Sequence, residues 1–255
     1  MTRTKQTCFL ACAALAAASF AWQVSAKPAD VDPQADKVLR AMTSYLAGLK
    51  QFSAETENSI EVVTKEGQKI QFIAPASVTV SRPNKLYAAR RGDIVNQQFY
   101  YDGKSLTLYN PDSKYYATTA APASVDEMLD FAQSQLDIIA PAADLLDTRA
   151  YTRLMQDATS GDYLGMAVVG GQRCHHLAYR AGSVDWQIWV REGDQPLPCR
   201  YVITTADMAG APQFTMQVTK WEVAPTIPAG TFDFVPPAGA KAIEFLPAAA
   251  AAQAK

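Results

Sequence analysis

Histidine is scarce in this chain of 255 residues, which contains only His175 and His176, side by side. Neighbouring residues of a strand point to opposite faces, so these two cannot bind one metal ion together. A structural zinc site needs four converging ligands, and a catalytic one needs three. The sequence therefore predicts no metal centre and no cofactor. We expect one histidine inside the predicted sheet and one outside it.

Motifs that carry catalysis are missing as well. No Gly-x-Ser-x-Gly nucleophile elbow occurs in the sequence. Residues 103–105 (GKS) imitate the end of a phosphate loop, but Gln98 stands where that loop needs its first glycine. We interpret residues 101–104 as a hairpin turn and predict that the protein is not an enzyme. A hydrolase that pairs one of the two histidines with a distant serine is a remote alternative.

The chain also lacks an excess of positive charge. It contains 23 basic and 25 acidic residues, and removal of the first 26 residues takes away Arg3 and Lys5, which leaves a formal charge of −4. A protein that binds nucleic acid needs a basic face, so the sequence excludes a nucleic-acid partner. With 49% hydrophobic residues, the chain is rich enough in apolar side chains to build a substantial core.

One long apolar run is present, at the N-terminus. Residues 8–22 follow a short basic start and precede residues 24–26 (VSA), a pattern that signal peptidase cleaves. The run is too short and too rich in alanine for a membrane-spanning helix, which needs about 20 strongly apolar residues. We predict a signal peptide at residues 1–26, cleavage after Ala26, and no stable membrane anchor. Lipidation of Cys12 is the alternative, because a small residue precedes that cysteine.

Only two cysteines, Cys174 and Cys199, follow the predicted signal peptide. In an oxidising compartment a disulfide is the default expectation. In a meander, however, these residues would begin strands that flank a third, about 9.5 Å apart, beyond the limit of roughly 7 Å between bonded Cα positions. They could still join past the end of the middle strand, at residues 193–196 (GDQP). We predict the bond, with two free thiols as the alternative.

Helical patterns occur in two parts of the chain. Asp32 and Pro33 are a typical helix start, and apolar residues recur at helical spacing over residues 33–50. A capping box at residues 124–127 (SVDE) begins a second helix. Pro141 ends that helix, and a further helical piece is expected over residues 142–156.

The remaining segments read as strands. Residues 52–119 carry turn signals about every ten residues, which is typical of an antiparallel meander, and strands return from Tyr163. A last short strand is expected at residues 231–235. One continuous antiparallel sheet with helices on one face explains this order most simply. We therefore predict a single domain over residues 27–247, followed by a disordered alanine-rich tail at residues 248–255.

Several motifs in the second half of the chain are distinctive. They are CHHLAY (174–179), VDWQIWV (184–190) and PLPCRYVITT (196–205), followed by PQFT (212–215), Trp221, FDF (232–234) and PP (236–237). With these motifs, the chain resembles a bacterial family of predicted periplasmic proteins, a domain of unknown function that looks related in fold to the LolA-like lipoprotein carriers. The likeness extends from Pro33 to about Leu246 and is sharpest in the second half.

This resemblance implies an α+β fold in which a single large antiparallel sheet curls into an open, incomplete barrel with helices packed on its concave face. In the carriers, the cavity between sheet and helices takes up acyl chains. The resemblance thus implies a periplasmic binding or carrier-like protein with an apolar cavity for a lipid, an acyl chain or a lipoprotein. The alternative is an envelope sensor or protein-interaction module of the same fold, with an envelope protein as its partner.

Large aromatic residues on the predicted strands are candidates to line such a cavity or a partner surface. Trp186 shares one face of its strand with Ile188, and Trp189 lies on the opposite face. Packing in the core is the ordinary explanation for such residues, and contact with an apolar ligand or a partner is the functional one. The candidates are Phe99, Tyr101, Tyr109, Trp186, Trp189 and Trp221.

Overall fold

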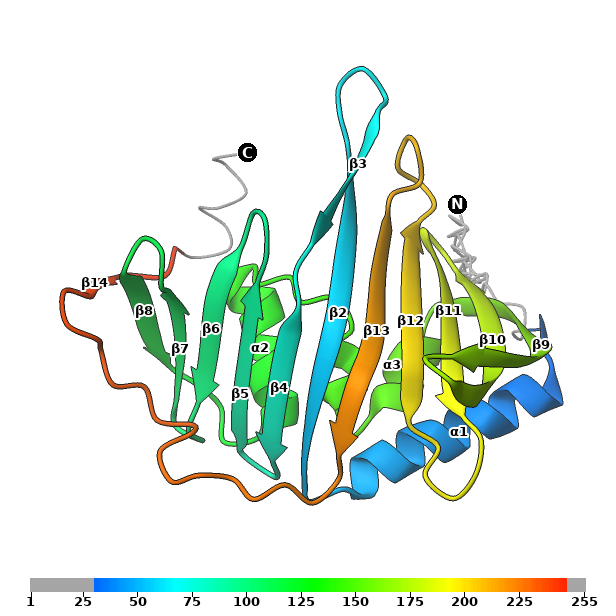
Figure 1. Cartoon of the computed structure of the whole chain (residues 1–255), viewed down its shortest axis with the longest axis horizontal. Helices are drawn as coiled ribbons and strands as arrows, with labels where there is room; N and C mark the ends of the chain where they lie inside the picture. Colours follow the sequence, from blue (N-terminus) through cyan, green and yellow to red (C-terminus); the bar gives the residue numbers. More distant parts are fainter. Residues whose placement is uncertain (1–29, 247–255) are drawn as a thin grey trace, which may run out of the picture.

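The computed structural model describes residues 30–246 of the chain (Figure 1). The predicted signal peptide with its cleavage site after Ala26, the candidate lipidation site Cys12 and the tail at 248–255 lie outside the described residues. The described residues form one sheet of 14 strands, accompanied by three α-helices and one 3₁₀ helix. The first and last strands, β1 and β14, lie at opposite ends of the strand order, so the sheet is open and does not close into a barrel.

The elements of the first half of the chain comprise eight strands and two helices. In chain order they are β1 (Asp30–Val31), α1 (Pro33–Gly48), β2 (Gln51–Val63), β3 (Lys69–Ile73), β4 (Ala76–Ser81), β5 (Lys85–Arg91), β6 (Asn96–Tyr101), β7 (Ser105–Asn110), β8 (Tyr115–Ala120) and α2 (Val125–Leu136).

The second half begins with two short helical pieces and continues with six strands. These are η1 (Ala143–Leu146), α3 (Ala150–Met155), β9 (Ala158–Val169), β10 (Gln172–Ala181), β11 (Val184–Arg191), β12 (Pro198–Thr205), β13 (Gln213–Glu222) and β14 (Lys241–Ile243).

The sheet consists of two meanders joined at its centre. Strands β4 to β8 pair consecutively and antiparallel, as do β9 to β13, and β13 pairs with β2 to join the two halves. The single antiparallel sheet predicted from the sequence is therefore confirmed. Two short parallel pairs, β1 with β9 and β14 with β8, extend the sheet at its edges and were not predicted.

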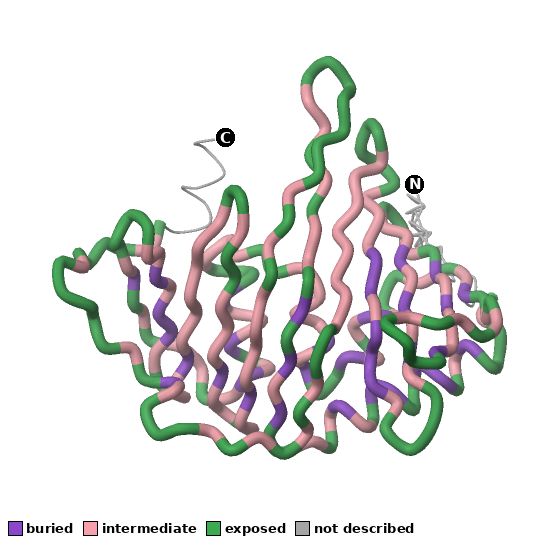
Figure 2. Tube along the Cα trace, in the orientation of Figure 1, coloured by how far each residue is buried: buried purple, intermediate pink, exposed green. Residues whose placement is uncertain are grey.

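The helices of residues 30–246 lie on one face of the sheet, which we call the inner face; the opposite face is the outer face (Figure 1). Helix α1, with η1 and α3, packs on β10 to β12 through a cluster of buried residues that includes Leu39, Leu177 and Ile188. Helix α2 packs on β2 and β4 to β7 through a second cluster, which includes Phe52 and Met128. Burial concentrates where helices back the sheet, and the protruding β2–β3 hairpin is largely exposed (Figure 2).

The predicted helix starts are confirmed by their caps. The Asp32 carboxylate accepts the backbone N–H of Gln34 at 2.6 Å, which satisfies a donor that the first helical turn leaves unpaired. The Ser124 hydroxyl accepts the N–H of Glu127 at 3.2 Å and donates to the Glu127 carboxylate at 2.9 Å. Both helices therefore begin where the sequence pattern places them.

The single helical piece expected over residues 142–156 was wrong, because the chain breaks between η1 and α3. Asp147 sits at this break with extended backbone, and its carboxylate accepts the N–H of Arg149 at 2.6 Å. This local bond from side chain to backbone competes with continuation of the helix. Two short turns result in place of one longer helix.

The strand expected at residues 231–235 was also wrong, because this segment contains no strand. Phe232 is buried, and Phe234 packs on outer-face tyrosines, with ring centroids 5.0 Å from Tyr116 and 5.2 Å from Tyr100. The segment meets the face of the sheet, where backbone N–H and C=O groups are already paired, and so it cannot add a strand. The last strand is β14 instead, which pairs with the free edge of β8.

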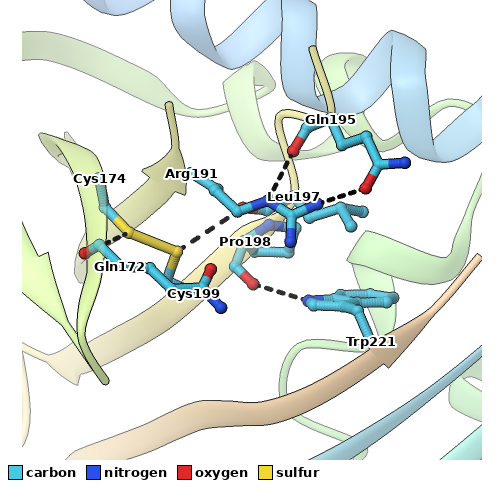
Figure 3. The surroundings of a disulfide bond; sticks show 8 residues. All are labelled: Gln172, Cys174, Arg191, Gln195, Leu197, Pro198, Cys199 and Trp221. Carbon is cyan, nitrogen blue, oxygen red and sulfur yellow. Dashed lines mark hydrogen bonds between the residues drawn. A yellow bond between two sulfur atoms is a disulfide. The ribbon is translucent and has the colours of Figure 1, made fainter. Parts of the chain in front are cut away.

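The predicted disulfide between Cys174 and Cys199 is present and links β10 to β12 across β11 (Figure 3). The Cα atoms are 7.1 Å apart, nearer than next-nearest strands usually lie. The register explains the approach: Trp189 pairs with Arg200 but Val190 pairs with Pro198, so Cys199 occupies a β-bulge. The bulge displaces Cys199 from the regular ladder at the end of the strand.

Candidate functional site

The space between α1 and the sheet is filled by side chains. Leu39 and Met42 of α1 are fully buried, as are Leu177 of β10 and Ile188 of β11. Trp186 packs in the same cluster, with its ring stacked on Tyr179 at a centroid distance of 4.1 Å. This part of the inner face therefore forms an ordinary close-packed core.

An apolar groove lies at the other end of the inner face, between the strands β6 to β8, the end of α2 and the segment around β14. Its volume is about 430 Å³, within the range of about 300 to 1,000 Å³ that is typical of small-molecule sites. The residues that line it are Gln97, Leu108, Asn110, Ser113, Tyr115, Tyr116, Ala117, Leu136, Asp137, Ile243, Glu244, Phe245 and Leu246. We call this site the apolar groove.

Local sequence explains why the groove is open. Leu108 pairs with Ala117 on the inner face, and the methyl group of alanine leaves room that a larger side chain would fill. Helix α2 ends at Leu136, because Asp137 has a left-handed conformation with a φ of 52° that closes the helix. Leu136 at the end of the helix lines the groove together with Asn110 of β7, Tyr115 of β8 and Ile243 of β14.

Arg90 lies on the inner face beside the groove. It pairs in register with Ala76, and its guanidinium donates to Gln97 Oε1 at 2.6 and 3.0 Å, while Gln97 itself lines the groove. Among the described residues, Arg90 forms no ion pair with a carboxylate. Desolvation by the surrounding protein lowers the pKa of Arg90, although the side chain remains accessible to solvent. The groove therefore has a cation next to it that lacks an acidic partner.

Three of the six predicted aromatic residues belong to the core. Tyr101 is fully buried and its hydroxyl donates to the carbonyl of Pro122. Trp186 is buried beneath α1. Trp221 touches both buried clusters, and its Nε1–H donates to the carbonyl of Pro198 at 2.9 Å (Figure 3). Phe99, a fourth candidate, is half-buried against the cluster beneath α2.

The other two aromatic candidates lie on the outer face. Trp189 stacks on His176 with a centroid distance of 4.0 Å and an interplanar angle of 14°, and the Arg200 guanidinium lies 5.5 Å from its ring centroid. Tyr109 is buried by Phe234, at 5.4 Å between ring centroids. The prediction that Trp186 and Trp189 occupy opposite faces is confirmed.

None of the six aromatic candidates is among the described residues that line the apolar groove, and their role in binding stays a prediction. Sequence reasoning missed the residues that form the groove, such as Leu108, Leu136 and Ile243. The alternation of Leu106, Thr107 and Leu108 identifies the inward-facing side of β7. No pattern of neighbouring residues, however, indicates that β14 pairs with β8 and so brings Ile243 to the groove.

The two histidines occupy opposite faces of β10, as predicted. His175 pairs with Val190 on the inner face, and its Nδ1 lies 3.0 Å from the Tyr163 hydroxyl. His176 Nε2 lies 3.0 Å from Gln187 Oε1, and desolvation lowers the pKa of His176. In the described part of the chain, no three His, Cys, Asp or Glu side chains gather closely enough to hold a metal ion.

A network of carboxylates and arginines ties α2 to α3. Asp147, whose side chain is 1% exposed, pairs with Arg149 at 2.9 Å and with Arg153 at 2.5 Å. Both arginines also pair with Asp130 of α2. Burial by itself would raise the pKa of Asp147, but hydrogen bonds from Arg149 and the charge of Arg153 outweigh burial and lower it. This network holds the helices together and keeps its acids ionised.

A second enclosed acid lies between η1 and the sheet. The Tyr201 hydroxyl donates to Asp144 Oδ2 at 3.4 Å. Burial raises the pKa of Asp144, and the hydrogen bond from Tyr201 offsets this only in part. A raised carboxyl pKa often marks a functional site, but Asp144 does not line the apolar groove.

The fold and the groove define the class of this chain as an open-sheet α+β protein with an apolar hollow on the helix-covered face. A family model described as "Predicted periplasmic protein (DUF2092)" matches residues 35–246, and the chain belongs to this family. The description agrees with the periplasmic location expected from the sequence. Within residues 30–246, no helix is both long and apolar enough to cross a membrane.

Several solved structures are similar in backbone arrangement. An uncharacterized conserved protein from Thermus thermophilus is 12% identical, with a TM-score of 0.49, and the match covers 83% of this chain and 99% of that one. The lipoprotein LppX from Mycobacterium tuberculosis is 13% identical, with a TM-score of 0.45 and coverages of 77% and 98%. A chain in the structure of the MucA/MucB complex from Pseudomonas aeruginosa is 10% identical, with a TM-score of 0.42, and the match covers 79% of this chain and 61% of that one. No curated protein sequence matches the chain.

Proposed function

We propose that this periplasmic protein is a non-catalytic binding or carrier-like protein that holds one acyl chain of a lipid or lipoprotein in the apolar groove. The observation that carries the proposal is the groove itself: about 430 Å³ of space, walled by Leu108, Ala117, Leu136 and Ile243. Hydrocarbon that enters it leaves water and contributes about 0.8 kcal/mol for each buried CH₂ group. An acyl chain suits such a wall better than a polar metabolite does.

Substitution at the floor of the groove tests the proposal. Ala117→Phe places a ring in the hollow, and we expect the affinity for a fluorescent fatty acid such as parinaric acid to fall about tenfold, or roughly 1.4 kcal/mol. Ala120→Phe is the matched control, because Ala120 is exposed on the same strand β8 but lies on its other face. Thermal unfolding would show that both variants fold.

Mass spectrometry of the protein purified from the periplasm of its native host provides the second measurement. We expect co-purifying acyl species that are lost in Ala117→Phe and kept in Ala120→Phe. Equal binding of the probe by both variants, or a purified protein that carries no acyl species and binds no probe, would refute the proposal.

The β2–β3 hairpin supports a second candidate function, an envelope sensor or interaction module that binds another envelope protein. Ile60, Val62 and Ile70 are 41%, 43% and 38% exposed. Val62 pairs with Ile70, and Ile60 pairs with Phe72, so these four residues share the inner face of the hairpin. Exposed apolar residues that gather on one face are typical of a contact surface.

A pair of variants separates the two functions. Val62→Lys should abolish cross-linking to an envelope protein in living cells and leave acyl binding unchanged, because Val62 lies outside the groove lining. Ala117→Phe should have the opposite effect. If Val62→Lys leaves every cross-link intact, the hairpin is not the contact surface.

A further inference from the structure

A second hollow lies on the outer face of the sheet, under the segment that follows β13. Its volume is about 240 Å³. Tyr100 and Tyr116 form its floor on β6 and β8, and Phe232 and Phe234 from the crossing segment lie against it. It lies on the opposite face of the sheet from the apolar groove, and among the described residues Tyr116 alone lines both. We call this site the outer pocket.

Aromatic rings crowd around the outer pocket. The centroid of Phe234 lies 5.2 Å from that of Tyr100 and 5.0 Å from that of Tyr116. The ammonium group of Lys85 lies 5.8 Å from the ring centroid of Phe232, so one of the protein's own cations already contacts an aromatic ring of this pocket. Faces of aromatic rings attract cations within about 6 Å of the centroid.

The charge of the pocket lining is negative. Asp102 and Asp233 both line it, and neither lysine nor arginine does. Burial would raise the pKa of Asp102, but hydrogen bonds from the N–H groups of Lys104 and Ser105 and from the Ser105 hydroxyl lower it. Asp102 is therefore ionised at neutral pH. In the described structure, the exposed Asp233 carboxylate has no hydrogen-bond or ion-pair partner.

We propose that the outer pocket binds a small alkylammonium ion, with the cation against the rings of Tyr100, Tyr116 and Phe234 and balanced by Asp102 and Asp233. This lining favours a cation, because carboxylates repel an anion and a neutral apolar molecule gains nothing from two charges. With about 240 Å³, the pocket is smaller than the range of about 300 to 1,000 Å³ for drug-sized ligands. A choline-sized ion fits this description. This proposal does not depend on the acyl-binding function.

Choline and its neutral isostere 3,3-dimethylbutan-1-ol are the matched probes, since they share a shape and differ in charge. We expect choline to shift the backbone NMR signals of Asp233 and Phe234 in a saturable manner, and the alcohol to leave them unchanged. Raising the salt concentration should weaken the binding of choline, because the pocket is open to solvent.

Asp233→Asn should weaken choline binding about two- to fivefold, the range for an exposed ion pair. Asp207→Asn is the control, because Asp207 is an exposed acid in the β12–β13 loop, outside the lining of the pocket. Equal shifts from choline and the alcohol would overturn the proposal. So would choline affinity that is unchanged in Asp233→Asn, or shifts confined to residues away from the outer face.

Discussion

The buried carboxylate of Asp147 allows a quantitative prediction about stability. In Asp147→Asn, the side chain loses its charge but keeps its shape, and two guanidinium groups lose a partner that is 1% exposed. Removal of one partner from a fully buried pair costs about 3 to 5 kcal/mol. Arg149 and Arg153 are 52% and 27% exposed and keep Asp130, so water and that acid offset part of the loss. We expect Asp147→Asn to destabilise the fold by about 2 kcal/mol.

The neighbouring acid supplies the control for this prediction. Asp130 pairs with the same two arginines, but its side chain is 46% exposed. Asp130→Asn should therefore cost less than about 1 kcal/mol, as exposed pairs do. Urea unfolding at pH 7 measures both values. The prediction attributes the larger loss for Asp147→Asn to the burial of Asp147. It is refuted if Asp147→Asn lowers the free energy of unfolding no more than Asp130→Asn does.

The dependence on pH follows from the lowered pKa of Asp147. A carboxyl group whose pKa is lower in the folded state contributes stability above its unfolded pKa, about 3.9, and loses it as the pH falls through the folded pKa. The difference between wild type and Asp147→Asn should thus be constant from pH 7 to about pH 5 and shrink below pH 4. A difference that stays the same down to pH 2 would contradict the ion-pair explanation.

Three further predictions concern other parts of the fold. Replacement of Cys174 and Cys199 by serine should destabilise the protein by about 3 kcal/mol in urea, and reductant should remove the difference from wild type. Asp144→Asn should stabilise the protein at pH 8 in thermal unfolding, because the raised pKa of Asp144 costs stability as the pH rises above about 4; an advantage that does not grow with pH would exclude this cause. Phe234→Ala should destabilise the fold by about 1 to 2 kcal/mol through lost ring contacts, and unchanged stability would show that the crossing segment packs too loosely to matter.

Patterns of neighbouring residues were sufficient to predict most of the individual elements. Asp32 and Ser124 satisfy the first backbone donors of their helices, and this requirement is local. The alternation that places Trp186 and Trp189 on opposite faces is also local. The order of the predicted elements led to one antiparallel sheet with helices on one face, and the family resemblance added that this sheet is open. The disulfide prediction was correct, but the bulge at Cys199 that permits it was not foreseen.

Long-range contacts account for what the sequence did not predict. The alternating phenylalanines of residues 232–234 favour a strand. In the structure this segment packs across the outer face of the sheet and does not form a strand. The apolar groove exists because β14 pairs with β8, more than 120 residues earlier, and because α2 ends at Leu136. Nothing in the sequence of β8 or of β14 indicates that these two segments pair. Among the six aromatic candidates, Tyr101, Trp186 and Trp221 pack in the core, which is the ordinary explanation for large aromatic residues on strands.

The pairing of β2 with β13 at the centre of the sheet joins strands that are synthesised at different times. Strand β2 ends at Val63 and its partner begins at Gln213, so about 150 residues must be made in between, which takes roughly 8 to 30 s at 5 to 20 residues per second. During that interval the edge of β2 that later pairs with β13 has no partner strand. Glu55 and Glu61 later contact Lys220 and the backbone of Gln213 across this pair of strands. Charged side chains on an unpaired strand edge disfavour pairing with other chains, and Glu55 and Glu61 place two such charges on the edge of β2.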